Sequence, residues 1–401
     1  MKKELKTIGC CLLATIISCN QPQQENAILT EKNQMGNVEN ATSPVDKKSK
    51  KKIKLAILLD TSGSMTGLIE QAKNQLWKIV NQLAKAKDKD GNDPEIELAL
   101  YQYGNSGLSI MNGYVQKISG FTSELDEISE KLFALTINGG SEYCGAVIQS
   151  SLNELQWSSN DEDLQIIFIA GNEPFTQGLV SYKGACALAN RTNVIVNTIF
   201  CGDYNTGVNT YWSDGATLGN GKYMNIDHDA KIVHIASPYD SEISKINTRL
   251  NDTYIPYGRS GKLKKEKQLK EDQNSQIYGE VNSVKRIISK GSKVYKNKSW
   301  DLVDAADEEK FNINEIEESN LPDKMKGMSS GEKLEYIKKH KTVRLAIKAQ
   351  IKELNKKREK YVAQIKAEKA LEGEEQLDDA IISSIIEQAE SKSFRFVEDI
   401  N

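Results

Sequence analysis

The stretch that decides the fold is Leu55-Ala-Ile-Leu-Leu-Asp60-Thr-Ser62-Gly-Ser64-Met65. A run of apolar residues ends abruptly in an aspartate, two hydroxyl-bearing serines and a glycine. In an open α/β sheet, ligands bind beyond the carboxyl end of a buried strand. One carboxylate and two alternate hydroxyls suit a hard cation that prefers oxygen ligands, such as Mg²⁺. The pattern therefore predicts a metal site formed by Asp60, Ser62 and Ser64 at the tip of the first core strand.

Downstream of this stretch, apolar strands alternate with amphipathic helices. The run 164–170 is almost continuously apolar, which is typical of a parallel strand covered on both faces. This alternation predicts an α/β fold with a doubly wound, mostly parallel sheet. The predicted strands cover residues 55–60, 96–101, 113–121, 164–170, 194–200 and 222–226, and the predicted helices lie near 65–83, 123–135, 147–155, 181–190 and 241–250.

Asp60-x-Ser62-x-Ser64 in this strand–turn–helix context resembles the metal-ion-dependent adhesion site (MIDAS) of von Willebrand factor type A (VWA) domains. The resemblance spans residues 53–257. It implies that the two serines and a residue of a second loop bind Mg²⁺ or another divalent cation, while carboxylates act mostly through water. An acidic side chain of a protein partner would complete the coordination. Ser141, after two glycines, stands where the family commonly has threonine, and Thr136 is the alternative.

The third loop departs from the family pattern. Ala170-Gly171-Asn172-Glu173-Pro174 resembles the usual Thr-Asp-Gly-Glu-Pro, so Gly171 occupies the place of the aspartate. Loss of an outer carboxylate is expected to lower metal affinity by roughly 10–100-fold. Asn172 and Glu173 are the candidates to compensate. In the competing interpretation the hydroxyls only cap the following helix and the site is degenerate.

The N-terminus has the pattern of an export signal rather than of a folded segment. Three lysines precede a short apolar core at residues 8–17, which is too short to span a membrane. The core ends in Ile16-Ile17-Ser18-Cys19, which resembles a bacterial lipobox and implies cleavage after residue 18 and lipid on Cys19. Asn20 then favours the outer membrane. The alternative is an ordinary signal peptide with an incidental cysteine.

The polar segment 19–52 cannot bury enough apolar surface to fold and is predicted to be a disordered tether. Beyond residue 257 the composition changes to Lys, Glu and Gln. Residues 258–401 are predicted to be helical and partly coiled-coil-like, because apolar residues follow an imperfect heptad that Arg358 interrupts. These helices are expected to pair with each other or pack on the domain, and a partner-binding role is the alternative.

Composition and missing motifs exclude several functions. A net charge of −3 with both signs intermixed disfavours nucleic-acid binding. Neither a phosphate-binding loop nor a dinucleotide fingerprint is present, so no nucleotide is expected. His228 lies between two aspartates, but no nucleophile motif accompanies it. Cys144, Cys186 and Cys201 allow one disulfide, with Cys186 and Cys201 as a candidate pair.

Together these features predict a lipid-anchored envelope protein, not an enzyme. Its VWA domain would bind a protein partner through a divalent metal, in adhesion or envelope scaffolding. One alternative is a metal-independent assembly module that acts through its C-terminal helices. A hydrolase that combines the same site with His228 is the third hypothesis.

Overall fold

The computed structural model describes residues 50–227, 235–368 and 377–396. The predicted signal peptide, Cys19, nearly all of the predicted tether and His228 lie outside these residues. Within the described ranges, the helices are too short or too polar to cross a membrane.

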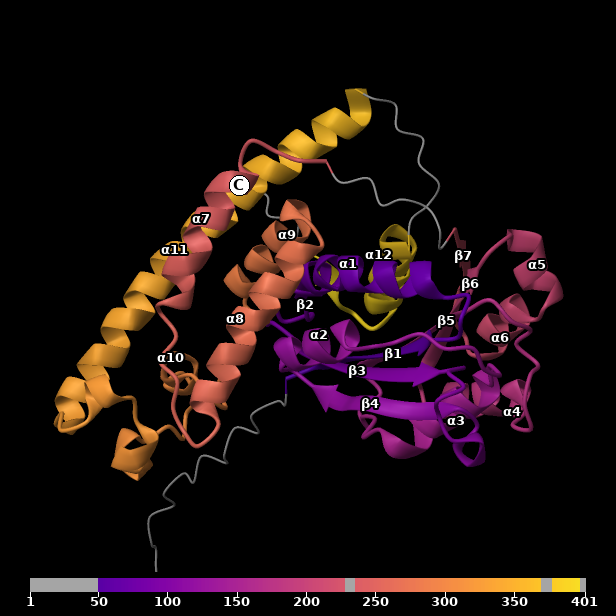
Figure 1. The fold of residues 1–401 in the computed structure, drawn as a ribbon, viewed down its shortest axis with the longest axis horizontal. Coiled ribbons are helices and arrows are strands. Elements are labelled where there is room, and N and C mark those ends of the chain that lie inside the picture. The colour runs from indigo at the N-terminus through magenta and orange to yellow at the C-terminus, as the bar shows by residue number, and fades with distance from the viewer. Residues whose placement is uncertain (1–49, 228–234, 369–376, 397–401) are drawn as a thin grey trace, which may run out of the picture. The chain divides into compact units, whose positions relative to one another are not determined.

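A six-stranded sheet of order β4-β3-β1-β5-β6-β7 forms the core of the fold (Figure 1). Neighbouring strands are parallel except β3 and β4, which run antiparallel at one edge. The predicted doubly wound, mostly parallel α/β sheet is therefore confirmed. The strands are β1 (Lys52–Asp60), β3 (Glu95–Tyr103), β4 (Val115–Thr122), β5 (Leu164–Gly171), β6 (Ile195–Cys201) and β7 (Tyr223–Ile226).

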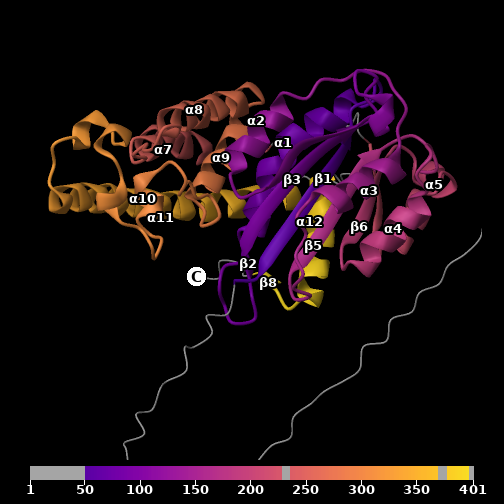
Figure 2. The same cartoon turned by 90° about the horizontal axis from the view of Figure 1, so that it is seen from below.

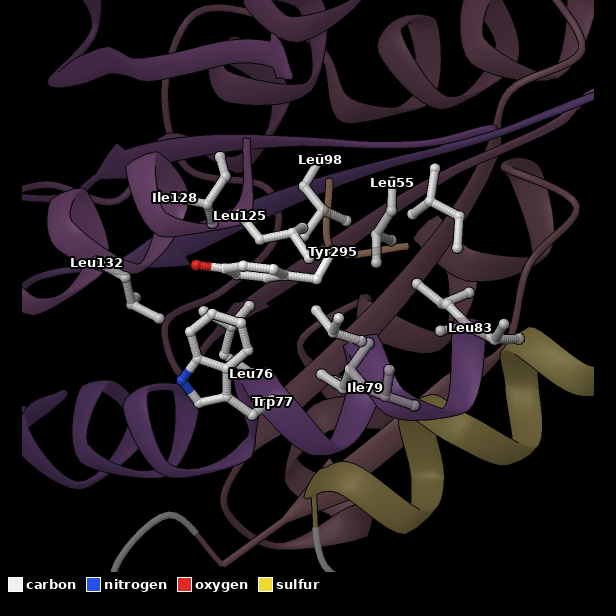
Figure 3. Packing of buried hydrophobic residues seen from close by; sticks show 14 of the residues in the cluster. Leu55, Leu76, Trp77, Ile79, Leu83, Leu98, Leu125, Ile128, Leu132 and Tyr295 are labelled. Carbon is white, nitrogen blue, oxygen red and sulfur yellow. The ribbon is translucent and has the colours of Figure 1, made fainter. Parts of the chain in front are cut away.

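Helices cover both faces of this sheet (Figures 1 and 2). On one face, Leu55 and Leu98 of the sheet pack with Trp77, Ile128 and Tyr295 in a single apolar cluster (Figure 3). The other face has its own apolar cluster. The first face carries α1 (Thr66–Leu83), α2 (Leu125–Phe133) and α12 (Leu377–Ser391), and the second carries α3 (Cys144–Glu154), α4 (Tyr182–Arg191) and α6 (Trp212–Leu218), with α5 (Tyr204–Asn209) beside α6.

The central strand β1 determines where a site can form. It lies between β3 and β5, with Asp60 opposite Tyr103 and Leu59 opposite Ala170. Because the three strands are parallel, the loops that follow them meet at one edge of the sheet, where ligands bind in open α/β folds.

The C-terminal region is helical, as predicted. Its longest helix, α11, presents Ile347, Ile351 and Leu354 to the main apolar cluster and contacts α7 and α9. Arg358, which interrupts the heptad, donates to the Asp240 carboxylate of α7 at 2.8 Å. α7 (Asp240–Asn251) is the helix predicted near 241–250 and precedes this region. The elements of the region are α8 (Gly261–Ile277), α9 (Glu280–Gly291), α10 (Leu302–Ala305), η2 (Ile313–Glu315), η3 (Glu318–Asn320), η4 (Asp323–Met325) and α11 (Ser330–Glu368).

The last helix, α12, returns to the sheet. Ile381, Ile385 and Ala389 are buried in the cluster that also contains residues of β1, β5 and β6, and α12 contacts α1 and β7. A short antiparallel pair of β2 (Ala86–Lys87) and β8 (Arg395–Phe396) follows. The predicted C-terminal region thus supplies part of the hydrophobic core of the sheet.

We expect Ile385→Ala to lower the free energy of unfolding by about 2–4 kcal/mol, because it leaves a cavity between α12 and the sheet. The Ile385 side chain is only 1% exposed. Urea denaturation measures the loss. Ile277→Ala is the matched control, because Ile277 is 80% exposed and should change stability by less than about 0.5 kcal/mol. Equal effects of the two variants would contradict the packing of α12 on the sheet.

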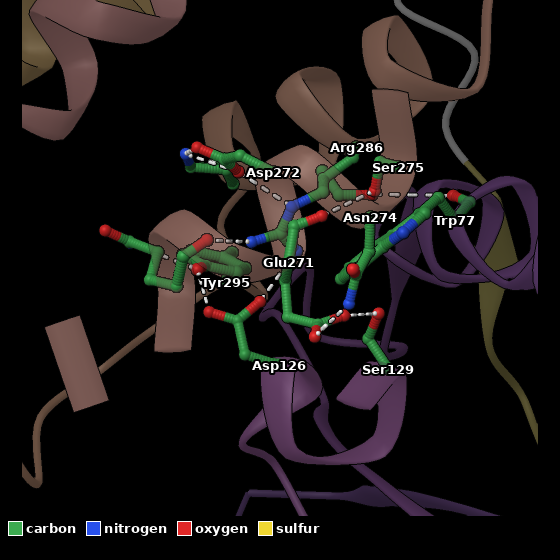
Figure 4. A network of polar contacts seen from close by, with 12 residues as sticks. Trp77, Asp126, Ser129, Glu271, Asp272, Asn274, Ser275, Arg286 and Tyr295 are labelled. Carbon is green, nitrogen blue, oxygen red and sulfur yellow. Dashed lines mark hydrogen bonds and ion pairs between the residues drawn. The ribbon is translucent and has the colours of Figure 1, made fainter. Parts of the chain in front are cut away.

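A buried polar network joins α2 to α8 and α9 (Figure 4). Arg286 of α9 donates to Asp126 at 2.7 Å and to Asp272 at 2.8 Å. Its guanidinium lies 4.8 Å from the ring centre of Trp77, at cation–π distance. Tyr295 also donates to Asp126. The network fixes the C-terminal helices against the sheet domain through ion pairs of the buried Arg286 guanidinium.

We expect the protein to lose stability at acid pH, because the Asp272 carboxylate then becomes protonated. Burial alone would raise the pKa of this carboxyl, but Lys290 and Arg286 outweigh it and hold the pKa well below its ordinary value. A depressed folded-state pKa stabilises the protein above the unfolded pKa of about 3.9, and this contribution is lost as the pH falls below it. Urea denaturation at neutral and at acid pH measures the free energy of unfolding. We expect its fall between the two pH values to be about 2 kcal/mol smaller in Asp272→Asn than in the wild type. An equal fall in both proteins would contradict this role.

Candidate functional site

Asp60 and the two serines of the motif lie together at the end of β1. The Asp60 carboxylate is buried, and its Oδ1 accepts the backbone N–H of Ser62 at 2.7 Å. The Oγ atoms of Ser62 and Ser64 are 3.3 Å apart, so the two hydroxyls face one point. Met65 is the N-cap residue of α1, and its side chain makes no capping hydrogen bond. Helix capping therefore does not account for these serines.

The third loop contributes Asn172. Its Nδ2 donates to Ser64 Oγ at 3.1 Å, which joins the loop after β5 to the loop after β1. Trp212, buried in α6, donates its indole N–H to the Glu173 carbonyl oxygen at 2.8 Å and thereby holds the loop in place. Both residues proposed to compensate for Gly171 are thus at or next to the motif.

Gly171 stands where no side chain fits. A Cβ atom there would lie 2.5 Å from the Tyr103 hydroxyl and 3.1 Å from Asp60 Oδ2. The Tyr103 hydroxyl is fixed in turn, because it donates to the Ala170 carbonyl oxygen at 2.9 Å. The family aspartate is therefore absent from a position that Tyr103 already fills.

Glu142 of the second loop brings a carboxyl group to Asp60 instead, and the sequence analysis missed it. Both side chains flank Gly104, whose Cβ position would lie 2.7 Å from Asp60 Oδ1 and 2.7 Å from Glu142 Cγ. Gly104 has a φ of +76°, so it keeps both the backbone turn and the space for the pair. The available signal was an acidic residue directly after Ser141 in a glycine-rich loop.

The two carboxyls change each other's ionisation. Burial, followed by the nearby Asp60 carboxylate, raises the pKa of Glu142 to about 9. Burial also raises the pKa of Asp60, against the lowering effect of its hydrogen bonds. Asp60 Oδ2 and Glu142 Oε2 are both buried without a hydrogen-bond donor among the described residues. Two acceptor oxygens in this state need a proton or a cation.

The remaining predicted residues lie close to this pair or at its edge. Ser141 is half-buried and immediately precedes Glu142. Thr136 is exposed, and its carbonyl oxygen accepts from Asn105 at 3.1 Å. Gln177 donates to the Glu173 carboxylate at 3.1 Å and accepts from the Glu142 backbone N–H at 3.3 Å, which ties the second loop to the third.

Hydrogen bonds between main-chain atoms hold the second loop in place. The Asn138 N–H donates to the Thr61 carbonyl oxygen at 3.1 Å, and the Ser106 N–H donates to the Gly139 carbonyl oxygen at 2.7 Å. The glycine-rich loop is thus fixed to the loops after β1 and β3. These bonds hold the loop that leads to Glu142 beside the loop that follows Asp60.

The cysteines form no part of the site. Cys144, Cys186 and Cys201 are buried free thiols, so the candidate pair Cys186–Cys201 is not bonded in the structure. Over the described residues, no group of three or more His, Cys, Asp or Glu side chains has the arrangement of a metal site. A cation at the tip of β1 would therefore depend on serine hydroxyls.

These oxygen donors fit a hard divalent cation. The supporting observation is that a buried oxygen of Asp60 and one of Glu142 have no hydrogen-bond partner among the described residues, while the Ser62 and Ser64 hydroxyls lie 3.3 Å apart. Ser62 and Ser64 would supply direct ligands, and the two carboxylates would supply charge. This distribution leaves few negative ligands on the ion, which favours an incoming carboxylate.

Residues 54–213 match the family model of the von Willebrand factor type A domain. The comparison with curated proteins gives no match. Three similar solved structures are the SpRpn10 VWA domain (19% identity, covering 43% of this chain and 87% of that chain, TM-score 0.33), BatB from Bacteroides thetaiotaomicron (14%, 44% and 90%, TM-score 0.34) and proximal thread matrix protein 1 from the mussel byssus with a zinc-occupied MIDAS motif (16%, 45% and 43%, TM-score 0.34). At this identity these likenesses concern the fold alone, and nothing about function follows from them.

Proposed function

From the match of residues 54–213 to the von Willebrand factor type A domain, we propose that the chain binds a protein partner through a divalent cation, by default Mg²⁺, at the tip of β1. The observation that carries the proposal is the convergence of the Ser62 and Ser64 hydroxyls beside the buried pair Asp60 and Glu142. Ser141 is the candidate third direct ligand. An acidic side chain of the partner would complete the coordination of the ion.

We further propose that the protein acts by binding rather than catalysis, as a lipid-anchored component of the bacterial cell envelope in adhesion or scaffolding. The support is the sequence of residues 1–52, with its signal-like core, Cys19 and polar tether. The outer membrane is the proposed location. A tether of this composition would let the domain reach partners away from the membrane surface.

The experiment that tests the proposal is capture of envelope proteins by the full chain in Mg²⁺ and in EDTA, with Asp60→Ala as the metal-site variant. We expect specific partners that are lost in EDTA and lost in the variant. Isothermal titration with Mg²⁺ reports the metal separately, with heat in the wild type and none in Asp60→Ala. Capture that survives EDTA and Asp60→Ala alike would support a metal-independent assembly module instead.

We expect Glu142→Gln to weaken Mg²⁺ binding by roughly 10–100-fold, because glutamine keeps the side-chain volume but cannot lose a proton to become the second negative charge beside the ion. Titration calorimetry measures the change. The matched control is Glu154→Gln, because Glu154 is an exposed glutamate on α3, the helix that follows Glu142. Equal Mg²⁺ affinity of Glu142→Gln and wild type would remove Glu142 from the site.

A further inference from the structure

A cavity of about 780 Å³ lies away from the proposed metal site, and residues of α1, α9, α10 and α11 line it. Its volume is in the range of small-molecule sites, about 300–1,000 Å³. α1 belongs to the VWA domain, and the three other helices belong to the C-terminal region. The cavity is therefore not part of the sheet edge at which VWA motifs gather.

The described lining of this cavity is strongly cationic. It includes nine lysines and two arginines but only four aspartates and glutamates. Several cations are neutralised by neighbours. Arg344 pairs with Asp301 at 2.6 Å, and Lys87 pairs with Asp93 at 2.6 Å. Lys293 reaches the same Asp93 at 3.5 Å. Lys85 pairs with Glu359 at 3.3 Å, Lys341 pairs with Asp307, and Arg358 pairs with Asp240. Cationic side chains outnumber the carboxylates of the lining.

Lys348 and Lys296 are the cations best placed to meet a ligand. The Lys348 ammonium donates to the uncharged carbonyl oxygen of Ser292 at 3.2 Å. Burial lowers the pKa of Lys348 to about 8; the charge of Asp304 opposes this lowering, and the charges of Arg344 and Lys296 add to it. A half-buried ammonium that donates to a neutral carbonyl oxygen beside two other cations would gain from a bound anion.

The same cavity has apolar walls. Ile288 of α9, Val303 of α10 and Ile351 of α11 line it together with Leu345, which is 57% exposed. Apolar side chains at the wall and ammonium groups beside them match a ligand with two chemically different ends. A bare inorganic ion would use only one of these features.

We propose that this cavity binds a phosphate-bearing amphiphile, with the phosphate at Lys348 and Lys296 and the apolar body against α9 and α11. The site is independent of the proposed metal site. Lysine is a common ligand of phosphate, and the two ammonium groups match the double charge of a phosphate monoester. The ligand could come from a bilayer lipid or from a free phosphomonoester, since both carry this head group.

The test uses the full chain and octyl phosphate below its micellar concentration, followed by titration calorimetry. We expect octyl phosphate to bind at least tenfold more tightly than inorganic phosphate or octyl glucoside, which carry only one of the two features. Lys348→Met and Lys296→Met should each weaken octyl phosphate by tenfold or more, since each removes a charge-assisted contact. Lys357→Met is the matched control, because Lys357 is exposed on α11 and does not line the cavity.

The proposal fails if octyl glucoside or inorganic phosphate binds as tightly as octyl phosphate, or if Lys357→Met weakens binding as much as Lys348→Met. Thermal melting of each variant separates lost binding from lost folding. If Lys348→Met unfolds, Lys296→Met provides the readout, because the Lys296 side chain is exposed.

Flotation with phosphatidylcholine vesicles, with and without phosphatidic acid, distinguishes the two sources of the ligand. Binding to the phosphatidic acid vesicles supports a bilayer lipid, and octyl phosphate binding without it supports a free ligand.

Discussion

Gly171→Asp, which introduces the aspartate that the family carries here, is expected to destabilise the protein by about 2–4 kcal/mol rather than to strengthen metal binding. The new Cβ would meet the Tyr103 hydroxyl at 2.5 Å, and overpacking of this kind typically costs about 1–3 kcal/mol. The added carboxylate would also lie beside Asp60 and Glu142, where a third negative charge is repelled. Urea denaturation measures the stability, and calorimetry measures Mg²⁺ affinity.

The control for Gly171→Asp is Gly120→Asp in β4. A Cβ at Gly120 meets nothing within 4 Å, so this variant should change stability by no more than about 0.5 kcal/mol. Tyr103→Phe removes the hydroxyl from the clash, so the double variant should recover part of the lost stability. A stable Gly171→Asp protein with tighter Mg²⁺ binding would show that Glu142 does not replace the family aspartate.

The second large effect is expected for Arg286→Met. Its guanidinium is fully buried and pairs with Asp126 and Asp272 (Figure 4). Its removal leaves Asp126 without its cation, whereas Asp272 keeps Lys290 at 2.8 Å. Breaking such a buried pair costs about 3–5 kcal/mol. Urea denaturation, followed by circular dichroism, measures the loss of the free energy of unfolding.

Lys298→Met is the control for Arg286→Met. Lys298 pairs with Glu308 at 3.4 Å, and both side chains are about half exposed, so the pair contributes no more than about 1 kcal/mol. A loss below that value for Arg286→Met would mean that the α2–α9 contact contributes little to stability. A separate early transition would show that the C-terminal helices unfold before the sheet.

The sequence was sufficient for the parts of the fold that depend on local patterns. The apolar runs of β1, β5 and β6 predicted their strands, and the abrupt change at Asp60 predicted the sheet edge where the loops meet. Asp60, Ser62 and Ser64 could be placed together because they lie at most four positions apart, on one strand and the turn that follows it. Such features need no knowledge of distant contacts.

Features that depend on distant contacts were not predictable in this way. Glu142 meets Asp60 only because Gly104, from a third segment, leaves space between them. The pairing of Arg286 with Asp126 joins residues 160 positions apart. In the same way, α12 carries an apolar stripe whose partner cannot be read from its own residues, and only the structure shows that this partner is the sheet.

The position of α12 and β8 has a consequence for the biogenesis of the chain. β8 pairs with β2, and Lys51 at the start of β1 donates to the Lys392 carbonyl oxygen. The surroundings of β1 are therefore complete only once residues 392–396 are in place. Contacts over such sequence separations slow folding, and a nascent chain that has not reached residue 396 exposes apolar surface. We therefore expect the sheet to finish folding only after residue 396 has emerged from the ribosome.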